Sequence, residues 1–410
     1  MRILLVVPMV PREEGPAIPQ LLHAQVEALS GRHEVTLVTA VGDEPGEGAA
    51  AAAFEHRTDL EVRLADRRRP PPGRGRWGRR ARLAAGWLRG SAWRTVWFAA
   101  PGIQREIDAA AVQPFDVVVA EDSSMAGFRY PPGVPRVLTE HEVRRPRPVR
   151  LSGTEGSLPG HLFAEVEWRR LTRAQPRAWG RFGLLQVFSA RDARSVEQLA
   201  PEVGPRVRVN PFGLVVPPAV EPERERDGLM LFVGDFTHAP NRDTARWLAE
   251  EILPRVEAEA PGARLRLVGK SMPRETRALA GPAVELVPDA PSVRAHLEEA
   301  AVVCAPVRIG GGMRMKVLGA MAAGKAVVTT PRGAEGMNAL DPDPPLAVAE
   351  GREAVAAATA SLLRDGAVRH QLGREARAFA ERHHSPEAWG HRLTAVYEEA
   401  QATRGSQAGR

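Results

Sequence analysis

Short apolar runs alternate with segments of helical spacing along most of the chain. The first run, residues 2–8, is apolar almost throughout, as expected for a strand buried on both faces of a parallel sheet. Residues 20–29 then have helical spacing, and residues 33–40 form a second apolar run. Strand, helix and strand in this order predict a βαβ unit and an α/β fold.

The same alternation continues and then starts again after a charged segment. Further buried strands are predicted at residues 115–120, 134–138, 184–189, 228–234, 264–269, 284–287 and 300–306. A charged helix is predicted over 165–175, with Pro176 ending it, and Asn241 is expected to cap the helix that follows strand 228–234. Pro217 and the charged residues 221–227 indicate a linker between two domains.

The composition is that of a globular protein with a basic surface. The 410 residues are 43% hydrophobic and 26% charged, and the single cysteine, Cys304, excludes an internal disulfide. The amino-terminal apolar run is too short for a signal-peptide core and no stretch spans a bilayer, so we expect a cytoplasmic protein. The net charge of +6 favours anionic partners such as nucleotides or lipid phosphates. We expect no nucleic-acid partner, because aromatic residues interleaved with basic ones in a base-stacking module are missing.

Residues 67–97 combine many arginines with tryptophans. Eight arginines lie within residues 67–82, and Trp77, Trp87, Trp93 and Trp97 lie among or after them. Three interpretations stay open. The segment is a solvated arm followed by an amphipathic helix, or a surface that contacts anionic lipid headgroups peripherally on the inner face of the membrane, or an edge that binds a phosphate-bearing acceptor.

The segment 308–336, RIGGGMRMKVLGAMAAGKAVVTTPRGAEG, carries the strongest chemical signal. Three glycines at a predicted helix start would leave the first backbone N–H groups open to a bulky anion, which the helix dipole also favours. Arg314 and Lys316 add full charges in the first turn. Only three of the 56 basic residues are lysines, which indicates that Lys316 is selected for its compact charge. The segment predicts a phosphate-binding site, and the alternative is a tight turn beside a solvated helix face.

This segment resembles the nucleotide-sugar site of the GT-B glycosyltransferases, in the retaining group-1 class often called family 4. The matching positions are Gly311, Gly312, Arg314, Lys316, Leu318, Ala320, Met321, Ala322, Gly324, Lys325, Val327, Val328, Thr330 and Gly333 to Gly336. The resemblance implies an α/β fold of two Rossmann-like β/α/β domains that face each other across a cleft. Residues 1–212 would bind the acceptor, residues 213–385 the nucleotide sugar, residues 386–401 would form a helix crossing back to the first domain, and residues 402–410 a mobile tail.

The resemblance also implies roles for individual residues. His141 and Glu142 follow the strand at 134–138 and match a pair beside the transferred sugar, so we assign them as catalytic; the alternative for His141 is a surface turn. The donor would be bound by Gly311, Gly312, Met313, Arg314 and Lys316, with Asp289 at the edge that reads the base and Gly15 in the loop after the first strand. Gly319 replaces the glutamate that holds the ribose in the family, and we expect Glu335 to compensate.

The predicted activity is transfer of a sugar from a UDP- or GDP-sugar to a lipid-linked or small-molecule acceptor, with retention of configuration and without a metal ion or other cofactor. Asp341 and Asp343 fit an Asp-x-Asp pattern, but their proline-rich loop is typical of a turn. Zinc-ligand spacing, a Ser-hydrolase elbow and a dinucleotide-binding glycine motif are all missing from the sequence. The alternative is a degenerate GT-B protein that binds nucleotide, lipid or a partner without catalysis, because the loss of a carboxylate at Gly319 costs roughly 1.5–3 kcal/mol of binding.

Overall fold

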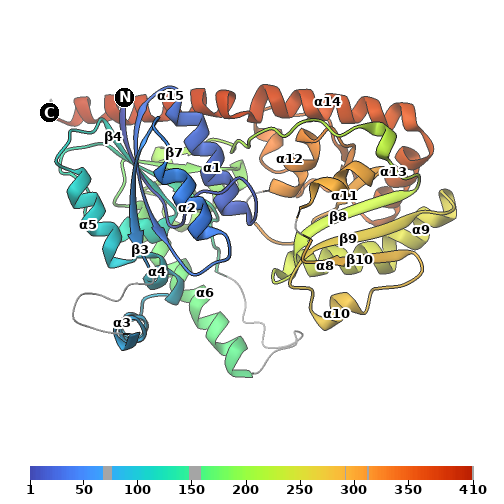
Figure 1. Cartoon of the computed structure of the whole chain (residues 1–410), viewed down its shortest axis with the longest axis horizontal. Helices are drawn as coiled ribbons and strands as arrows, with labels where there is room; N and C mark the ends of the chain where they lie inside the picture. Colours follow the sequence, from blue (N-terminus) through green and yellow to red (C-terminus); the bar gives the residue numbers. More distant parts are fainter. Residues whose placement is uncertain (68–75, 147–157, 291, 312–313, 409–410) are drawn as a thin grey trace. The chain divides into compact units, whose positions relative to one another are not determined.

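The computed structural model describes residues 1–67, 76–146, 158–290, 292–311 and 314–408 (Figure 1). Its contacts divide the chain into two compact units. The first unit combines Met1–Asn210 with Trp389–Arg410, and the second is Pro211–Ala388. We expected domains of 1–212 and 213–385, so the observed divisions fall two residues earlier at one end and three later at the other. The first unit is therefore assembled from two separate parts of the chain.

Among the described residues, seven parallel strands form the sheet of the first unit, in the order β3-β2-β1-β4-β5-β6-β7. The strands are β1 (Arg2–Val6), β2 (Glu34–Val41), β3 (Glu61–Asp66), β4 (Val117–Glu121), β5 (Arg136–Glu140), β6 (Leu184–Val187) and β7 (Val207–Val209). The chain builds outward from β1 to β3 and then crosses to β4 on the other side of β1. The strand order therefore reverses between β1 and β4, where loops leave the carboxyl edge in opposite directions and a crevice opens.

Helices connect these strands. They are α1 (Ala17–Ser30), α2 (Glu47–Glu55), α3 (Arg76–Leu88), α4 (Trp93–Phe98), α5 (Pro101–Ala110), α6 (Leu158–Trp179), α7 (Ala190–Leu199) and α15 (Pro386–Ala408), with short 3₁₀ turns η1 (Ser123–Gly127) and η2 (Gly204–Arg206). The prediction that Pro176 ends α6 is wrong, because the helix continues to Trp179; a proline this near the end removes only one intrahelical hydrogen bond. The tail predicted from residue 402 is also corrected, because α15 runs through Ala408.

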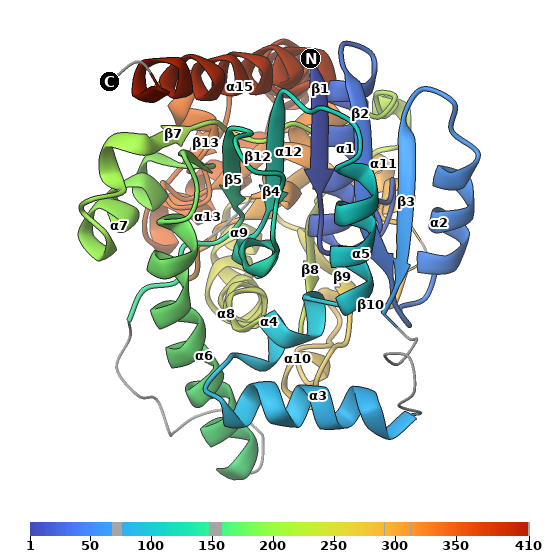
Figure 2. The same ribbon diagram turned by 90° about the vertical axis from the view of Figure 1, so that its left-hand side faces the viewer.

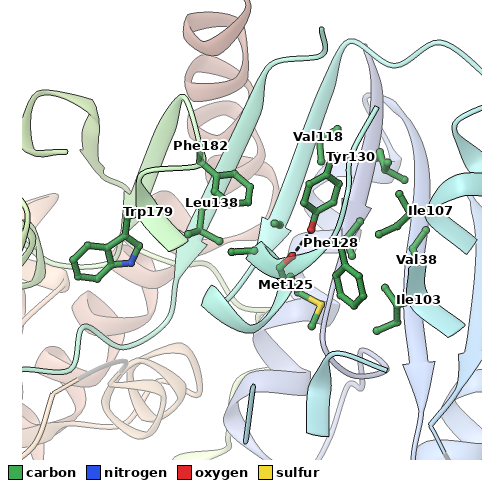
Figure 3. Close-up of a cluster of buried hydrophobic side chains, with 14 of the residues drawn as sticks. Val38, Ile103, Ile107, Val118, Met125, Phe128, Tyr130, Leu138, Trp179 and Phe182 are labelled. Atoms are coloured by element: carbon green, nitrogen blue, oxygen red, sulfur yellow. Dashed lines mark hydrogen bonds between the residues drawn. The ribbon is translucent and has the colours of Figure 1, made fainter. Parts of the chain in front are cut away.

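The core of the first unit lies between its sheet and these helices. Val38, Val118 and Leu138 come from β2, β4 and β5, and Ile103 and Ile107 come from α5, all of them without exposed surface (Figure 3). The Tyr130 hydroxyl donates a hydrogen bond of 2.7 Å to the Met125 carbonyl, so the one polar atom of that ring is satisfied inside the cluster. The apolar runs of the sequence thus become strands covered on both faces.

In the described part of the second unit, six parallel strands form a sheet in the order β10-β9-β8-β11-β12-β13. They are β8 (Leu229–Asp235), β9 (Arg264–Lys270), β10 (Val284–Pro288), β11 (Val302–Ala305), β12 (Val327–Thr329) and β13 (Ala347–Val348). The order again reverses once, between β8 and β11. Both units therefore have a Rossmann-like topology, and the carboxyl ends of β8 and β11 define the switch point of the second.

The helical elements of the second unit are η3 (Pro222–Arg224), α8 (Ala239–Trp247), the π-helical η4 (Leu248–Ile252), α9 (Leu253–Glu259), α10 (Arg274–Arg277), α11 (Arg294–Glu299), α12 (Met315–Ala322), η5 (Met337–Ala339), α13 (Arg352–Arg364) and α14 (Gly366–His384). Phe232 of β8, Leu265 of β9 and Cys304 of β11 are fully buried in its core. In neither unit does a described helix combine the length and the apolarity needed to cross a bilayer.

Candidate functional site

The carboxyl edge of the second sheet is closely packed where β8 and β9 end. A Cβ atom at Gly269 would lie 1.7 Å from the Gly234 carbonyl oxygen, so only glycine allows this approach of the two strand ends. The loop after β8 and the turn after β11 leave this edge on either side of the switch point. In α/β proteins a ligand binds in the crevice between such loops.

The glycine turn lies before α12 and is not its first turn, which corrects the predicted helix start. Gly310 has a φ of +94°, and a Cβ there would approach Cγ of Pro240 to 2.8 Å. This left-handed backbone cannot belong to an α-helix, so α12 begins at Met315 with Arg314 as its N-cap. Gly311 is exposed, whereas Gly312 and Met313 lie outside the described residues.

Arg314 ties the glycine turn to the loop that follows β12. Its buried guanidinium donates hydrogen bonds to the carbonyl oxygens of Arg332 at 3.0 Å and Gly311 at 2.9 Å. It also forms an ion pair with the Glu335 carboxylate at 3.3 Å. The structure therefore brings the predicted residues Arg314 and Glu335 together, and it uses both of them to hold this loop pair in place.

Lys316 lies in α12, after the glycine turn, and contacts residues on the other side of the switch point, in β8 and the helix that follows it. Its ammonium donates a hydrogen bond to Asn241 Oδ1 and lies 4.3 Å from the centroid of the Phe232 ring. Burial, aided by the nearby charge of Arg314, lowers the pKa of Lys316 to about 7, although Asp235 acts in the other direction. The amine consequently loses its charge at a lower pH than an exposed lysine does.

Asn241 does not cap α8, contrary to the prediction. The N-cap position belongs to His238, and Asn241 lies inside the first turn, where its Nδ2 donates a hydrogen bond of 2.6 Å to the Asp235 carbonyl oxygen. With both ends of the amide occupied, Oδ1 is directed at Lys316. Sequence reasoning missed this role because the partner lies 75 positions away in the chain.

Two arginines near this edge are neutralised within the protein. Arg308 pairs with Asp243 at 2.9 Å and covers the ring of Trp247 at 4.4 Å, and Arg242 pairs with Glu275 at 2.9 Å. Lys316 has no carboxylate within ion-pair distance among the residues that the structure describes. The charge of its ammonium is thus available to an anion.

The predicted base-reading residue Asp289 follows β10 and has a left-handed φ of +51°, and Ser271, which follows β9, has a φ of +55°. The Ser271 amide donates a hydrogen bond of 3.3 Å to Asp289 Oδ1, which joins the two strand ends. Such conformations are costly for residues other than glycine and are often kept at binding sites.

On α12, a Cβ at Gly319 would meet no atom within 4 Å, so the position lost to glycine is sterically open.

In the first unit, His141 follows the end of β5 and is buried. Its Nε2 lies 2.8 Å from Glu121 Oε2, and its ring stacks on Phe188 with centroids 5.9 Å apart. Burial alone would lower the pKa of His141, but the hydrogen bond and charge of Glu121, together with Asp122, raise it. Its Nδ1 has no hydrogen-bond partner in the described structure. Sequence reasoning missed Glu121, because the pairing of its strand with β5 is known only from the fold.

Two further acids lie beside His141. Burial, and then the charge of Asp122, raise the pKa of Glu140 to about 7, and Trp179 Nε1 donates a hydrogen bond of 2.8 Å to this carboxyl group. Asp122 has a φ of +72° and borders a small cavity that Arg94 and Arg144 also line. This edge therefore holds a cluster of acids around a histidine.

Glu142 is linked to this cluster through Arg144, whereas Gly15 lies in a different loop. Glu142 forms an ion pair of 3.0 Å with Arg144, and its side chain is partly exposed. Gly15 lies in the loop between β1 and α1, where its carbonyl oxygen accepts a hydrogen bond from Gln20 at 2.7 Å. Gly15, His141 and Glu142 belong to the first unit, and the other candidate residues belong to the second.

The described residues contain no group of three or more His, Cys, Asp or Glu side chains placed to hold a metal ion. The Asp343 amide donates a hydrogen bond of 3.0 Å to Asp341 Oδ1, which is a local turn outside any helix or strand. The two aspartates of the Asp-x-Asp pattern accordingly belong to a turn that Asp341 stabilises.

Residues 227–365 match the model of the family described as Glycosyl transferases group 1. The matched segment contains the glycine turn, Lys316 and Asn241. No curated protein matches the chain in sequence.

Solved structures match the chain over almost its whole length. HepE from Anabaena, in complex with UDP and glucose, is 13% identical with a TM-score of 0.62, covering 97% of this chain and 99% of that one. Sucrose-phosphate synthase from Thermosynechococcus elongatus is 15% identical with a TM-score of 0.66, covering 98% and 100%. A UDP-forming α,α-trehalose-phosphate synthase from Burkholderia xenovorans is 12% identical with a TM-score of 0.59, covering 97% and 99%. The chain has the predicted GT-B fold, with a group 1 glycosyltransferase match in its second unit.

Proposed function

We propose that this protein transfers a sugar from a nucleotide-diphosphate sugar to an acceptor. The observation that carries the proposal is the enclosed ammonium of Lys316 at the switch point of the unit that matches the group 1 model. A diphosphate leaving group gains negative charge as the bond to the sugar breaks. A preorganised cation in a partly dry site stabilises that charge more effectively than water does.

The start of α12 supplies the second part of the phosphate site. The first backbone N–H groups of a helix have no partner within it, and its dipole adds partial positive charge there. Lys316 is the second residue of α12, so its side chain and these amides serve the same anion. Arg314 and Glu335 act in this proposal as positioning residues that fix the glycine turn, while Gly311 allows close approach of the phosphates.

The donor is proposed to be a UDP- or GDP-sugar. HepE is solved with UDP and with UDP-glucose, which favours a uridine donor for a chain of the same fold. We assign reading of the base to Asp289 and Ser271, which follow the neighbouring strands β10 and β9. Retention of configuration and independence of metal ions follow from the resemblance to the retaining group-1 class and form part of the proposal, as does a cytoplasmic location.

His141 is proposed as the group of the first unit that contacts the sugar. Glu121 holds Nε2, which leaves Nδ1 as the atom for a substrate hydrogen bond. Glu142, whose carboxylate pairs with Arg144, is proposed to support His141. The acceptor is a lipid-linked or small molecule.

Binding and turnover together test the proposal. Calorimetry should detect UDP or GDP binding to the wild-type chain, and a panel of nucleotide sugars should reveal release of one nucleotide. Lys316→Ala should weaken nucleotide binding about tenfold to a hundredfold and lower nucleotide release, whereas Lys270→Ala, which removes an exposed lysine at the end of β9, should leave both unchanged. Binding without turnover on any donor would favour the non-catalytic alternative, which the open position at Gly319 supports. No binding of either nucleotide would overturn the proposed donor site.

A further inference from the structure

We propose that the first unit docks on an anionic lipid bilayer through the apolar patch, which we define as Leu88, Trp93, Leu162 and Phe163. These side chains come from α3, the start of α4 and the start of α6. The inference concerns the first unit alone and holds whether or not the second unit binds a nucleotide sugar.

All four residues expose much of their surface. The exposed fractions are 77% for Leu88, 58% for Leu162, 44% for Phe163 and 37% for Trp93. Isolated apolar side chains on a protein surface are common, whereas a group of large ones in one place marks an interaction surface.

The contacts bring the segments that carry these residues to one place. The Trp87 ring, next to Leu88 in sequence, stacks on Phe163 with centroids 6.3 Å apart. The Trp93 amide donates a hydrogen bond of 2.7 Å to Glu167, one turn after Phe163 on α6. The end of α3, the start of α4 and the start of α6 therefore meet, and Figure 2 shows α3 and this end of α6 together below the strands.

The patch stands on a rigid support. Arg170 covers the Trp87 ring at 4.3 Å and donates hydrogen bonds to the carbonyl oxygens of Trp87 at 2.7 Å and Ser91 at 3.1 Å, which satisfies the end of α3. Between α3 and α4, a Cβ at Gly86 would approach Val96 to 2.6 Å, so the two helices are in close contact. The exposed side chains are therefore carried by helices that pack against one another.

The charge around the patch identifies the partner. Residues 80–105, whose side chains the structure describes, contain five arginines and no aspartate or glutamate. Arg80 and Arg89 on and beside α3 are exposed, and within the described part of the chain neither has an ion-pair partner. Apolar side chains with tryptophan among arginines are the composition of a surface that enters the headgroup region of an anionic bilayer.

Other occupants fit these charges less well. A second copy of the chain on a two-fold axis would bring the same arginines together and repel. A nucleic-acid backbone would pair with the arginines, but it offers nothing to the aliphatic Leu88 and Leu162. A bilayer satisfies both the charges and the apolar side chains.

Vesicle sedimentation with the full chain tests the proposal. Vesicles of phosphatidylcholine mixed with phosphatidylglycerol should bind the protein, and vesicles of phosphatidylcholine alone should bind it weakly. Leu88→Ser with Phe163→Ser should weaken binding about tenfold or more, because two large apolar side chains no longer enter the bilayer. The matched control is Val112→Ser, since Val112 is 87% exposed after α5, beside the amino end of β4 and outside the patch.

Charge reversal provides a second arm. Arg89→Glu should weaken binding by roughly fivefold to thirtyfold, because each basic residue near the surface contributes about 1 kcal/mol and reversal removes about twice that. Arg129→Glu, with a side chain that is 81% exposed beside α5, makes the same change in net charge outside the patch and should have a smaller effect. Acyl chains that carry bromine should quench tryptophan fluorescence in the wild type and less so in Trp93→Phe.

Several outcomes would overturn the proposal. A folded wild-type protein that does not bind anionic vesicles would do so, as would an equal loss of binding in the Val112 variant and the patch variants. A dimer that depends on Leu88 and Phe163 would identify a second copy as the occupant, and tighter binding to single-stranded RNA than to vesicles would identify a nucleic acid. A thermal transition unchanged in the variants would show that lost binding reflects the surface and not unfolding.

Discussion

Lys316 and Asn241 join the two loops that flank the switch point of the second sheet. The lysine ammonium is held by one amide oxygen and one aromatic face, and no carboxylate within the described residues neutralises it at ion-pair distance. A cation kept in this way is ready for an anionic ligand, because its partners orient it without cancelling its charge.

Removal of this cation should weaken nucleotide binding. We expect Lys316→Ala to raise the Kd for UDP about tenfold to a hundredfold, because a hydrogen bond to a charged group contributes roughly 1.5–3 kcal/mol. Asn241→Ala should have a smaller effect in the same direction, since the ammonium loses its orientation. Calorimetry would measure both, with Lys270→Ala as the control. An unchanged Kd in Lys316→Ala would place the phosphates elsewhere.

Nucleotide binding should also depend on pH. The pKa of Lys316 is lowered to about 7, so the charged form is present below that pH and is lost above it. A bound diphosphate favours the charged form, so the Kd should rise by up to tenfold per pH unit above about 7. At pH 8 binding should take up close to one proton, measured from the binding enthalpy in buffers of different ionisation enthalpy. Lys316→Met should abolish this uptake, and uptake that persists in the variant would contradict the assignment.

The sequence indicated the chemistry of this region but not its geometry. The apolar runs predicted β8 and β11, and the glycines predicted a turn next to a helix. The left-handed backbone of Gly310 and its contact with Pro240 shift the helix start to Met315, and neither is visible without the neighbouring loop. The contact between Lys316 and Asn241 arises only when β8 and β11 lie side by side, so spacing along the chain could not reveal it.

The buried pair in the first unit should influence turnover more than donor binding. Glu121→Gln removes the charge that keeps the pKa of His141 raised, so we expect turnover to fall about tenfold to a hundredfold and the alkaline side of its pH profile to move to lower pH. The Kd for UDP should change less than about twofold. Steady-state kinetics across pH would check this, with the exposed Glu202→Gln as the control. A pH profile that does not move would leave Glu121 with a purely structural role.

The buried acid Glu140 should make the stability of the protein depend on pH. Its folded pKa, about 7, lies above the ordinary 4.5, so its contribution is complete below about 4.5 and is lost as the pH rises to about 7. The loss should amount to roughly 3 kcal/mol. Glu140→Gln should remove this pH dependence, so that the free energy of unfolding of the variant, compared with that of the wild type, is more favourable at pH 8 than at pH 5. Urea unfolding at both values, with Glu202→Gln as the control, would check the difference, and parallel behaviour of variant and parent would refute it.

In the first unit, pattern alone predicted the strands well and their side-chain partners poorly. The run at 134–138 placed His141 after β5, where ligands bind. Its partner Glu121 looked like a loop residue, but it is the last residue of β4, and the parallel register sets it opposite Thr139. Strand order decides which residues meet at a sheet edge, and a single sequence does not state that order.

The division of the first unit between the two ends of the chain affects how the protein is made. Trp389 and Tyr397 are buried there, and Tyr397 lies 3.5 Å from Gln25, which itself holds Glu121 at 2.6 Å. During synthesis the second unit is complete on leaving the ribosome while the first still waits for its closing helix. A fragment that stops at Asn210 would expose an unfilled groove over α1, so the half that is translated first is the half that matures last.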